Sequence, residues 1–343
     1  MINKTPILTN ESYLVNGTNL DFDLINKKSK FNNIQIDYND DIVMENLNIN
    51  EFTYGIGNDV FDNNIKYNNH NLNLTTKKKT NMKIEYNFDN NSNTLANNIN
   101  INADHDLHLT VIYRSNTNDY NLLNSMMKIN VKDNITVTAD VVNLLNNKSN
   151  QLVAIEAMLN NESKMTFNVI DIGAKNSISN IYINALGKKA VGKINTIYMG
   201  ENKELKDINY ITHLRGESSV IDIDVEGTLD NESKKSFKGT IDFKKGAKKS
   251  KGTESEKCIM LSEKAISKAL PILLCTEENV EGSHSAASGK IDEELIYYVM
   301  SRGIDKNNAV KMIVKAKFHK IIEKIKDEIL KEEIIKAVER KLS

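Results

Sequence analysis

The sequence predicts a mainly β protein that ends in a helical segment, and three observations support this. Short stretches of alternating apolar and polar residues recur between about residue 80 and residue 245. Asparagine, a residue typical of turns, occurs about fifty times, and about three-quarters of these positions precede residue 151. After about residue 290 the apolar residues instead recur every three or four positions, which is typical of helices.

Composition excludes several classes of protein. The chain has 343 residues, 40% of them hydrophobic and 27% charged, as in folded soluble proteins. The formal charge of -1 argues against a general nucleic-acid binder, and two cysteines are too few for a disulfide framework or a thiolate zinc finger. There is no run of 18 apolar residues and no apolar segment at the start. We therefore expect a cytoplasmic protein without a membrane-spanning segment.

The chain divides into three parts by pattern. Residues 1–79 form a short N-terminal segment that is polar and rich in Asn, in which we expect loops and brief strands such as 42–44. Residues 80–270 form the β core. Residues 271–343 form the C-terminal part, which contains the helices.

The β core is expected from period-two alternation, which predicts strands with one buried face. Ten or more such stretches follow one another too closely for helices to intervene, among them 82–86, 107–111, 129–131, 135–137, 165–169, 181–183 and 220–225. Asn16-Gly17 is the only Asn-Gly hairpin signal, and the polar corners suit a parallel β-helix. Because no fixed-period repeat is visible, a β-helix and a sandwich both stay open on these grounds.

Residues 234–251 are rich in lysine, with Phe237, Ile241 and Phe243 alternating between polar positions. A solvated strand face followed by a turn explains this pattern, and a phosphate-binding patch is the alternative.

Helix signals follow at the C-terminus. Asp292 is placed to cap a helix that runs to Arg302, with Gly303 as a left-handed stop. Asp305 is placed to cap a second helix, and a third is expected at about 328–342. Their apolar stripes exceed what three helices can bury together, so they must pack on the β core or on a partner.

Candidate chemical motifs are weak. The segment from Gly187 to Lys193 matches seven positions of a phosphate-binding loop, but the eighth is Ile194 where Ser or Thr must hold magnesium. We therefore expect no nucleotide site. Asp222 and Asp224 share one strand face, as paired acids of a polysaccharide enzyme do, although a solvated face explains them equally.

Histidine and cysteine positions suggest no catalyst either. His105 and His108 would lie on opposite faces of a strand, and His213 is expected to be a hydrogen-bonded structural residue. Cys258 and Cys275 have apolar neighbours, so we expect buried thiols.

One stretch is specific. Residues 269–304, ALPILLCTEENVEGSHSAASGKIDEELIYYVMSRGI, closely resemble the C-terminal signature of the SufB/SufD family of iron–sulfur cluster assembly proteins. Weaker resemblances occur at 207–213 and 237–241, and the likeness covers about 80–343. The matching positions are Pro271, Val280, Ser283, His284, Ala286, Gly289, Ile291, Asp292, Tyr298, Ser301, Arg302, Gly303 and Ile304.

The resemblance implies a right-handed parallel β-helix followed by a small helical lobe. It also implies pairing through the β-helices and docking of the C-terminal helices on SufC, an ABC-type ATPase. We expect Tyr298, Ser301, Arg302, Gly303 and Ile304 to belong to this docking lobe. Such a complex builds a transient iron–sulfur cluster at the subunit interface and transfers it to apo-proteins. We expect no cofactor to be bound stably by this chain alone.

Within the family the sequence is more similar to SufD than to SufB. SufB-like chains carry a Cys and a Glu at the positions that here hold Ala265 and Ser285, and Gly282 replaces a Cys often found two residues before the histidine. His284 stands where the SufD histidine is a proposed cluster ligand, and imidazole suits iron. The alternative is that His284 only forms a hydrogen bond across the interface.

The expected function is therefore that of a non-catalytic SufD-like scaffold subunit, paired with a SufB-type paralogue. A divergent SufB/SufD paralogue that forms a homodimer with the ATPase is the alternative within the family. Outside the family, the alternative is a β-helix polysaccharide enzyme. We expect no nucleic-acid or membrane partner.

Overall fold

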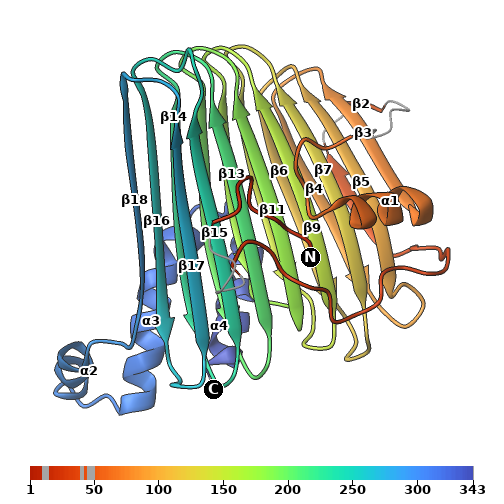
Figure 1. The fold of residues 1–343 in the computed structure, drawn as a ribbon. Coiled ribbons are helices and arrows are strands. Elements are labelled where there is room, and N and C mark those ends of the chain that lie inside the picture. Colours follow the sequence, from red (N-terminus) through yellow and green to blue (C-terminus); the bar gives the residue numbers. More distant parts are fainter. Residues whose placement is uncertain (10–14, 39–41, 45–50, 343) are drawn as a thin grey trace.

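The computed structural model describes residues 1–9, 15–38, 42–44 and 51–342. Two nine-stranded sheets face each other, and from β3 onward the chain alternates between them, strand after strand (Figure 1). Within each sheet these strands are parallel to their neighbours, as β8, β10 and β12 are. The result is a parallel β-helix of about eight turns, which settles the choice between a β-helix and a sandwich.

We name the sheets by what covers them. The helix-side sheet consists, in order, of β1 (Ile34–Tyr38), β4 (Thr80–Phe88), β6 (Leu107–Ser115), β8 (Thr136–Leu144), β10 (Lys164–Asp171), β12 (Val191–Gly200), β14 (Val220–Leu229), β16 (Ser250–Met260) and β18 (Val280–Gly289). The N-side sheet consists of β2 (Ile42–Met44), β3 (His70–Thr76), β5 (Thr94–Ala103), β7 (Leu122–Val131), β9 (Asn150–Leu159), β11 (Asn176–Ala185), β13 (Leu205–Leu214), β15 (Lys234–Phe243) and β17 (Ile266–Cys275). Strands β1 and β2 are antiparallel to β4 and β3.

The length of a turn varies along the coil. Lys164 pairs with Val191, 27 positions further on, whereas Lys234 pairs with Ile266, 32 positions further on. This variation explains why no fixed-period repeat is visible in the sequence. The strands continue to Gly289, so the coil includes the first part of segment 271–343. The three-part division of the chain remains a prediction.

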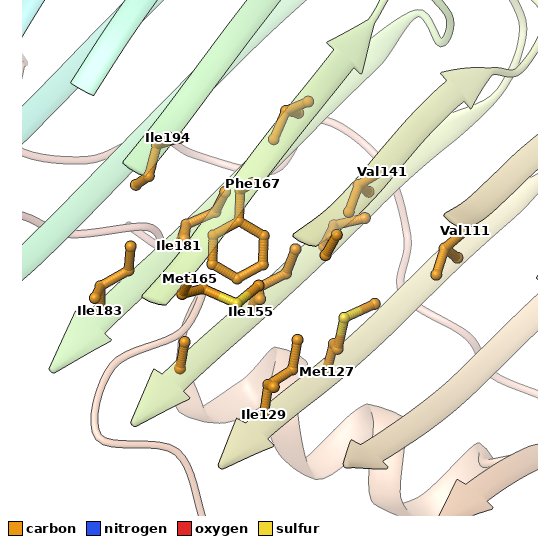
Figure 2. Close-up of a cluster of buried hydrophobic side chains, with 14 of the residues drawn as sticks. Val111, Met127, Ile129, Val141, Ile155, Met165, Phe167, Ile181, Ile183 and Ile194 are labelled. Carbon is orange, nitrogen blue, oxygen red and sulfur yellow. The ribbon is translucent and has the colours of Figure 1, made fainter. Parts of the chain in front are cut away.

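The core lies between the two sheets, where the alternating apolar side chains meet (Figure 2). Phe167 of β10 points into this space beside Ile155 and Ile181 from the opposite sheet (Figure 2). All three side chains are almost fully buried. Each of the seven alternating stretches named above falls within or overlaps a strand, because one face of every strand turns inward.

Asparagine has two roles in the coil. Asn134, Asn202 and Asn231 adopt positive φ at corners between strands, as expected for turn residues. Others stack inside strands: Asn168 donates to Asp140 at 2.7 Å, and Asn195 donates to Asn168 at 3.0 Å. These side-chain ladders join successive turns of the β-helix. The sequence predicts Asn only at chain reversals, so it does not reveal this role.

Parts of the N-terminal segment, around Ile2, Phe22 and Val60, pack on the outer face of the N-side sheet. The segment contains α1 (Asn58–Tyr67), a helix that the sequence did not suggest because its composition is polar and its N-cap, Gly57, makes no side-chain hydrogen bond. Val60 of α1 packs against Leu152 and Ile178 of the sheet. The brief strand expected at 42–44 is β2. Tertiary packing, rather than local propensity, therefore stabilises α1.

Three helices follow the coil: α2 (Glu293–Met300), α3 (Lys306–Ile322) and α4 (Glu328–Lys341). Asp292 caps α2 and Asp305 caps α3, as predicted, and Gly303 has a φ of +86°. Phe318 of α3 and Ile334 of α4 join one buried cluster with residues of the helix-side sheet. The helices are therefore not a wholly separate lobe, since only α2 and the start of α3 project from the coil (Figure 1).

Among the helices of the described residues, none is long and apolar enough to cross a membrane.

Candidate functional site at the open end of the β-helix

The last turn of the coil leaves two strand edges without a neighbour. Strands β17 and β18 end their sheets, and all ten residues of β18 are half-buried or exposed. Ile266 and Leu273 of β17 are 43% and 39% exposed. Because unpaired edges and apolar side chains meet here, this end can accept another chain. We call it the open end.

His284 lies on β18 at the open end. It pairs in register with Glu254 of β16, and paired residues of neighbouring parallel strands point to the same face. Gly282, two positions earlier, faces Phe243 and Leu273 between the sheets. His284 therefore points to the interior side of the last turn, yet it is exposed because no further turn follows.

A buried polar cluster lies below this surface. The hydroxyl of Tyr198 donates to Glu256 at 2.8 Å, and the ammonium of Lys235 lies 2.9 Å from the same carboxylate. The side chains of Lys235 and Glu256 are fully buried. Charges removed from water in this way require a close partner, so this arrangement joins three turns of the coil.

Glu254, two residues earlier on the same face of β16, differs from Glu256. It is 3% exposed, and neither of its carboxyl oxygens has a hydrogen-bond partner among the described residues. Burial, and secondarily the nearby Glu256 carboxyl, raises the pKa of Glu254 to about 8. A proton can therefore stay on this group near neutral pH, where an ordinary glutamate is ionised.

The two cysteines differ in environment. Cys258 is buried, as expected, and burial raises the pKa of its thiol. Cys275 is exposed, so the expectation of two buried thiols was wrong for this residue. It lies at the end of β17, the edge strand, where its apolar neighbours do not surround it.

The lysine-rich stretch was only partly understood from sequence. Lys245, Lys248 and Lys249 are exposed, as a solvated turn requires, but Lys235 and Lys238 are buried against acidic partners. Lys238 lies 2.6 Å from Asp207 under the N-terminal segment. One signal was available: Glu254 and Glu256 occupy the inward positions of a strand, where apolar residues are the rule.

The predicted docking residues surround the turn between α2 and α3. Tyr298 is 56% exposed, and Arg302 stacks on its ring with 4.5 Å between guanidinium and centroid. Ser301 caps the helix, and Ile304 packs on the small α2–α3 cluster. Arg302 lies in the turn after α2, and its partner Tyr298 belongs to that helix.

The weaker motifs do not form sites. The segment 187–193 lies in a turn and the start of β12, without the helix that a phosphate-binding loop precedes. Asp222 accepts from Thr253 at 2.8 Å, while Asp224 pairs with Lys320 of α3 at 2.7 Å. The two acids therefore fasten neighbouring elements instead of flanking a substrate.

His213 is a structural histidine, as expected. Its ring lies 3.0 Å from the Tyr182 hydroxyl and 3.7 Å from Asp242, and Tyr54 of the N-terminal segment contacts it edge-on. Burial lowers the pKa of His213 to about 4; Lys244 and Arg215 lower it further, and Asp242 opposes them.

Metal ligands do not cluster within one chain. Among residues 1–9, 15–38, 42–44 and 51–342, no group of three or more His, Cys, Asp or Glu is placed to hold a metal ion. His108 instead pairs with Asp140 at 2.7 Å, and His105 precedes the strand. A metal held at His284 would therefore need at least one ligand beyond those that the described residues bring together.

Fold and site define the chain as a parallel β-helix protein with an open end and an appended helical segment. The family model described as "SUF system FeS cluster assembly, SufBD core domain" matches residues 86–317. The chain therefore belongs to the SufB/SufD family, which confirms the resemblance of residues 269–304.

Relatives agree with this assignment. The chain is 27% identical over 223 residues to the iron-sulfur cluster assembly protein SufD of Bacillus subtilis, covering 64% of this chain and 51% of that protein. It is 26% identical over 157 residues to SufD of Escherichia coli, covering 46% and 37%. A SufBD family protein of Archaeoglobus fulgidus is 35% identical over 152 residues, covering 44% and 40%. The chain thus spans between about a third and about half of the length of these relatives.

Proposed function

We propose that the protein is a non-catalytic, SufD-like scaffold subunit of a cytoplasmic SufBCD-type complex that assembles iron–sulfur clusters and transfers them to apo-proteins. Iron and sulfide are cargo in this function. The open end with exposed His284 is the observation that carries the proposal, because it leaves an imidazole ligand beside two strand edges that a partner can extend.

The edges of β17 and β18 support a β-helical partner. The terminal turn of a second chain would extend both sheets and bury Ile266 and Leu273. A SufB-type paralogue is favoured over a second copy of this chain, since no group of three or more metal ligands lies at His284 among the described residues. Such a paralogue would bring the cysteine that this chain lacks at position 265. A homodimer remains the alternative arrangement.

The projecting helices support an ATPase contact. Leu295, Tyr297 and Tyr298 of α2 and Met312 of α3 are each at least 43% exposed. Apolar patches of this kind, rimmed by charge, usually mark partner sites. We assign this surface to a SufC-type ABC ATPase.

Co-expression tests the proposal. The chain is produced with its cognate SufB and SufC candidates, the complex is isolated by size-exclusion chromatography without oxygen, and iron and sulfide are assayed. A complex that contains all three chains and both elements is expected. Elution of this chain alone, or a three-chain complex without iron and sulfide, would contradict the function, while a stable complex with SufC alone would favour the homodimer.

A further inference from the structure

Glu254 is a buried acid whose environment is incomplete. One oxygen of its neighbour Glu256 is held by Tyr198 and Lys235, whereas both oxygens of Glu254 lack a hydrogen-bond partner among the described residues. Leaving a buried polar group without a partner costs free energy. A group retained in this state calls for a ligand that arrives later.

The surroundings make room for this carboxyl group. Gly239 of β15 faces it across the interior, and a Cβ atom at Gly239 would lie 2.3 Å from the Glu254 carboxyl carbon. A larger residue at 239 would therefore displace the acid. The missing side chain thus allows Glu254 to extend between the sheets, one turn below the open end.

His284 is the nearest ligand-forming residue on the next strand. It pairs in register with Glu254 on the same face, and neighbouring strands are about 4.8 Å apart. His284 has no hydrogen-bond or ion-pair partner among the described residues. An unpartnered carboxyl group and an unpartnered imidazole are therefore adjacent at the last turn of the coil, where β18 is exposed.

We propose that Glu254 and His284 together bind a divalent cation of the Fe²⁺ class at the open end. The inference rests on the proposed function, to which it adds a second ligand, an oxygen donor from the turn below. Imidazole nitrogen with carboxylate oxygen is a donor set that suits Fe²⁺, Co²⁺ and Mn²⁺. The ion is the positively charged partner that the Glu254 carboxylate lacks, and water or a partner chain completes the coordination.

Cobalt tests the site on the purified full chain. Co²⁺ is titrated without oxygen and followed by its visible absorption and by equilibrium dialysis. One saturable Co²⁺ per chain is expected, and Glu254→Gln and His284→Ala should each weaken binding at least tenfold. Glu281→Gln, an exposed acid on the opposite face of β18 paired with Lys251, is the matched control and should bind as wild type.

Three results would overturn the site: no saturable Co²⁺ on the wild-type chain, wild-type affinity in Glu254→Gln, or equal losses in Glu281→Gln. Thermal unfolding checks that each variant is folded. If Glu254→Gln does not fold, Glu254→Asp replaces it. This change keeps the carboxyl group but shortens the side chain by one methylene, which moves the carboxyl group away from the cation. The same tenfold loss is expected.

The assembled complex separates this inference from the function on which it rests. Loss of iron and sulfide in both the Glu254→Gln and His284→Ala complexes supports the cation site and the proposed function. Normal content in the Glu254→Gln complex, with loss in the His284→Ala complex, overturns the role of Glu254 and leaves the function standing. If the chain forms no complex with its partners, the function fails, and the cobalt titration still decides the cation site.

Discussion

The hydroxyl of Tyr198 on β12 donates a hydrogen bond to Glu256 on β16, 58 positions later and two turns further along the coil. The contact is possible because Gly227 of the intervening β14 carries no side chain; a Cβ there would lie 1.9 Å from the Tyr198 ring. Lys235 completes the arrangement from the opposite sheet. Near the open end the interior of this β-helix thus contains buried polar groups beside the apolar core.

The first prediction concerns this contact. Gly227→Ala places a methyl group inside the Tyr198 ring position and should lower the free energy of unfolding by about 1–3 kcal/mol, as overpacking does. Urea denaturation measures the loss. Gly289→Ala, which meets nothing within 4 Å, is the control.

A double mutant sharpens the same test. Tyr198→Ala removes the ring that the new methyl group would meet. The double mutant Gly227→Ala, Tyr198→Ala should therefore lose less free energy of unfolding than the sum of the losses of the two single mutants. Strict additivity would show that the two residues do not share this space.

The second prediction concerns acid sensitivity. The pKa of His213 is about 4 in the folded protein and about 6.5 in an unfolded chain. The unfolded state therefore binds a proton first as pH falls, and the protein should lose up to about 3 kcal/mol of stability at this residue between pH 6.5 and pH 4. The acids and bases that face the ring are Asp242, Lys244 and Arg215.

Stability curves of His213→Gln against pH measure this effect. The variant should lose less stability than wild type between pH 6.5 and pH 4, while His105→Gln, at an exposed position, should follow wild type. Parallel curves for wild type and His213→Gln would contradict the assignment.

The third prediction concerns the cluster ligand. His284 is exposed at the end of the coil, so His284→Ala should fold and melt as wild type. In the assembled complex, iron and sulfide content should fall. Normal content would leave His284 with only a hydrogen-bonding role across the interface.

The fourth prediction separates the docking surface from the fold. Arg302, in the turn after α2, contacts Tyr298 of that helix, so Arg302→Glu should weaken ATPase binding at least tenfold, by calorimetry, with unchanged circular dichroism. Gly303→Val forces a β-branched residue to a φ of +86° and should disturb the α2–α3 corner itself. Normal ATPase binding by Arg302→Glu would remove this residue from the contact.

Much of the architecture follows from sequence because its causes are local. Alternation along residues such as 165–169 places side chains on two faces wherever the strand lies, and Asp292 and Asp305 cap their helices through nearby backbone amides. The family was readable because residues 269–304 keep their spacing. These features depend on contacts within a few residues.

Other features depend on which strands become neighbours. The pairing of Glu254 with His284, 30 positions later, and the reach of Tyr198 to Glu256 follow from the register of successive turns. Because the length of a turn varies, this register cannot be obtained by counting residues. The same reason hides the burial of Lys235, which depends on an acid in the facing sheet.

The sequence by itself therefore determined the alternating strands, the helix caps, the family and, through the family, His284 as the candidate ligand. Only the tertiary structure decided that His284 lies at an open end, that Glu254 lies beside it without a partner, and that α3 and α4 pack on the coil. The physical reason is the separation along the sequence of the residues that interact. Alternation and capping act over a few residues, whereas burial and charge pairing depend on residues about 30 to 200 positions apart that the coil brings together.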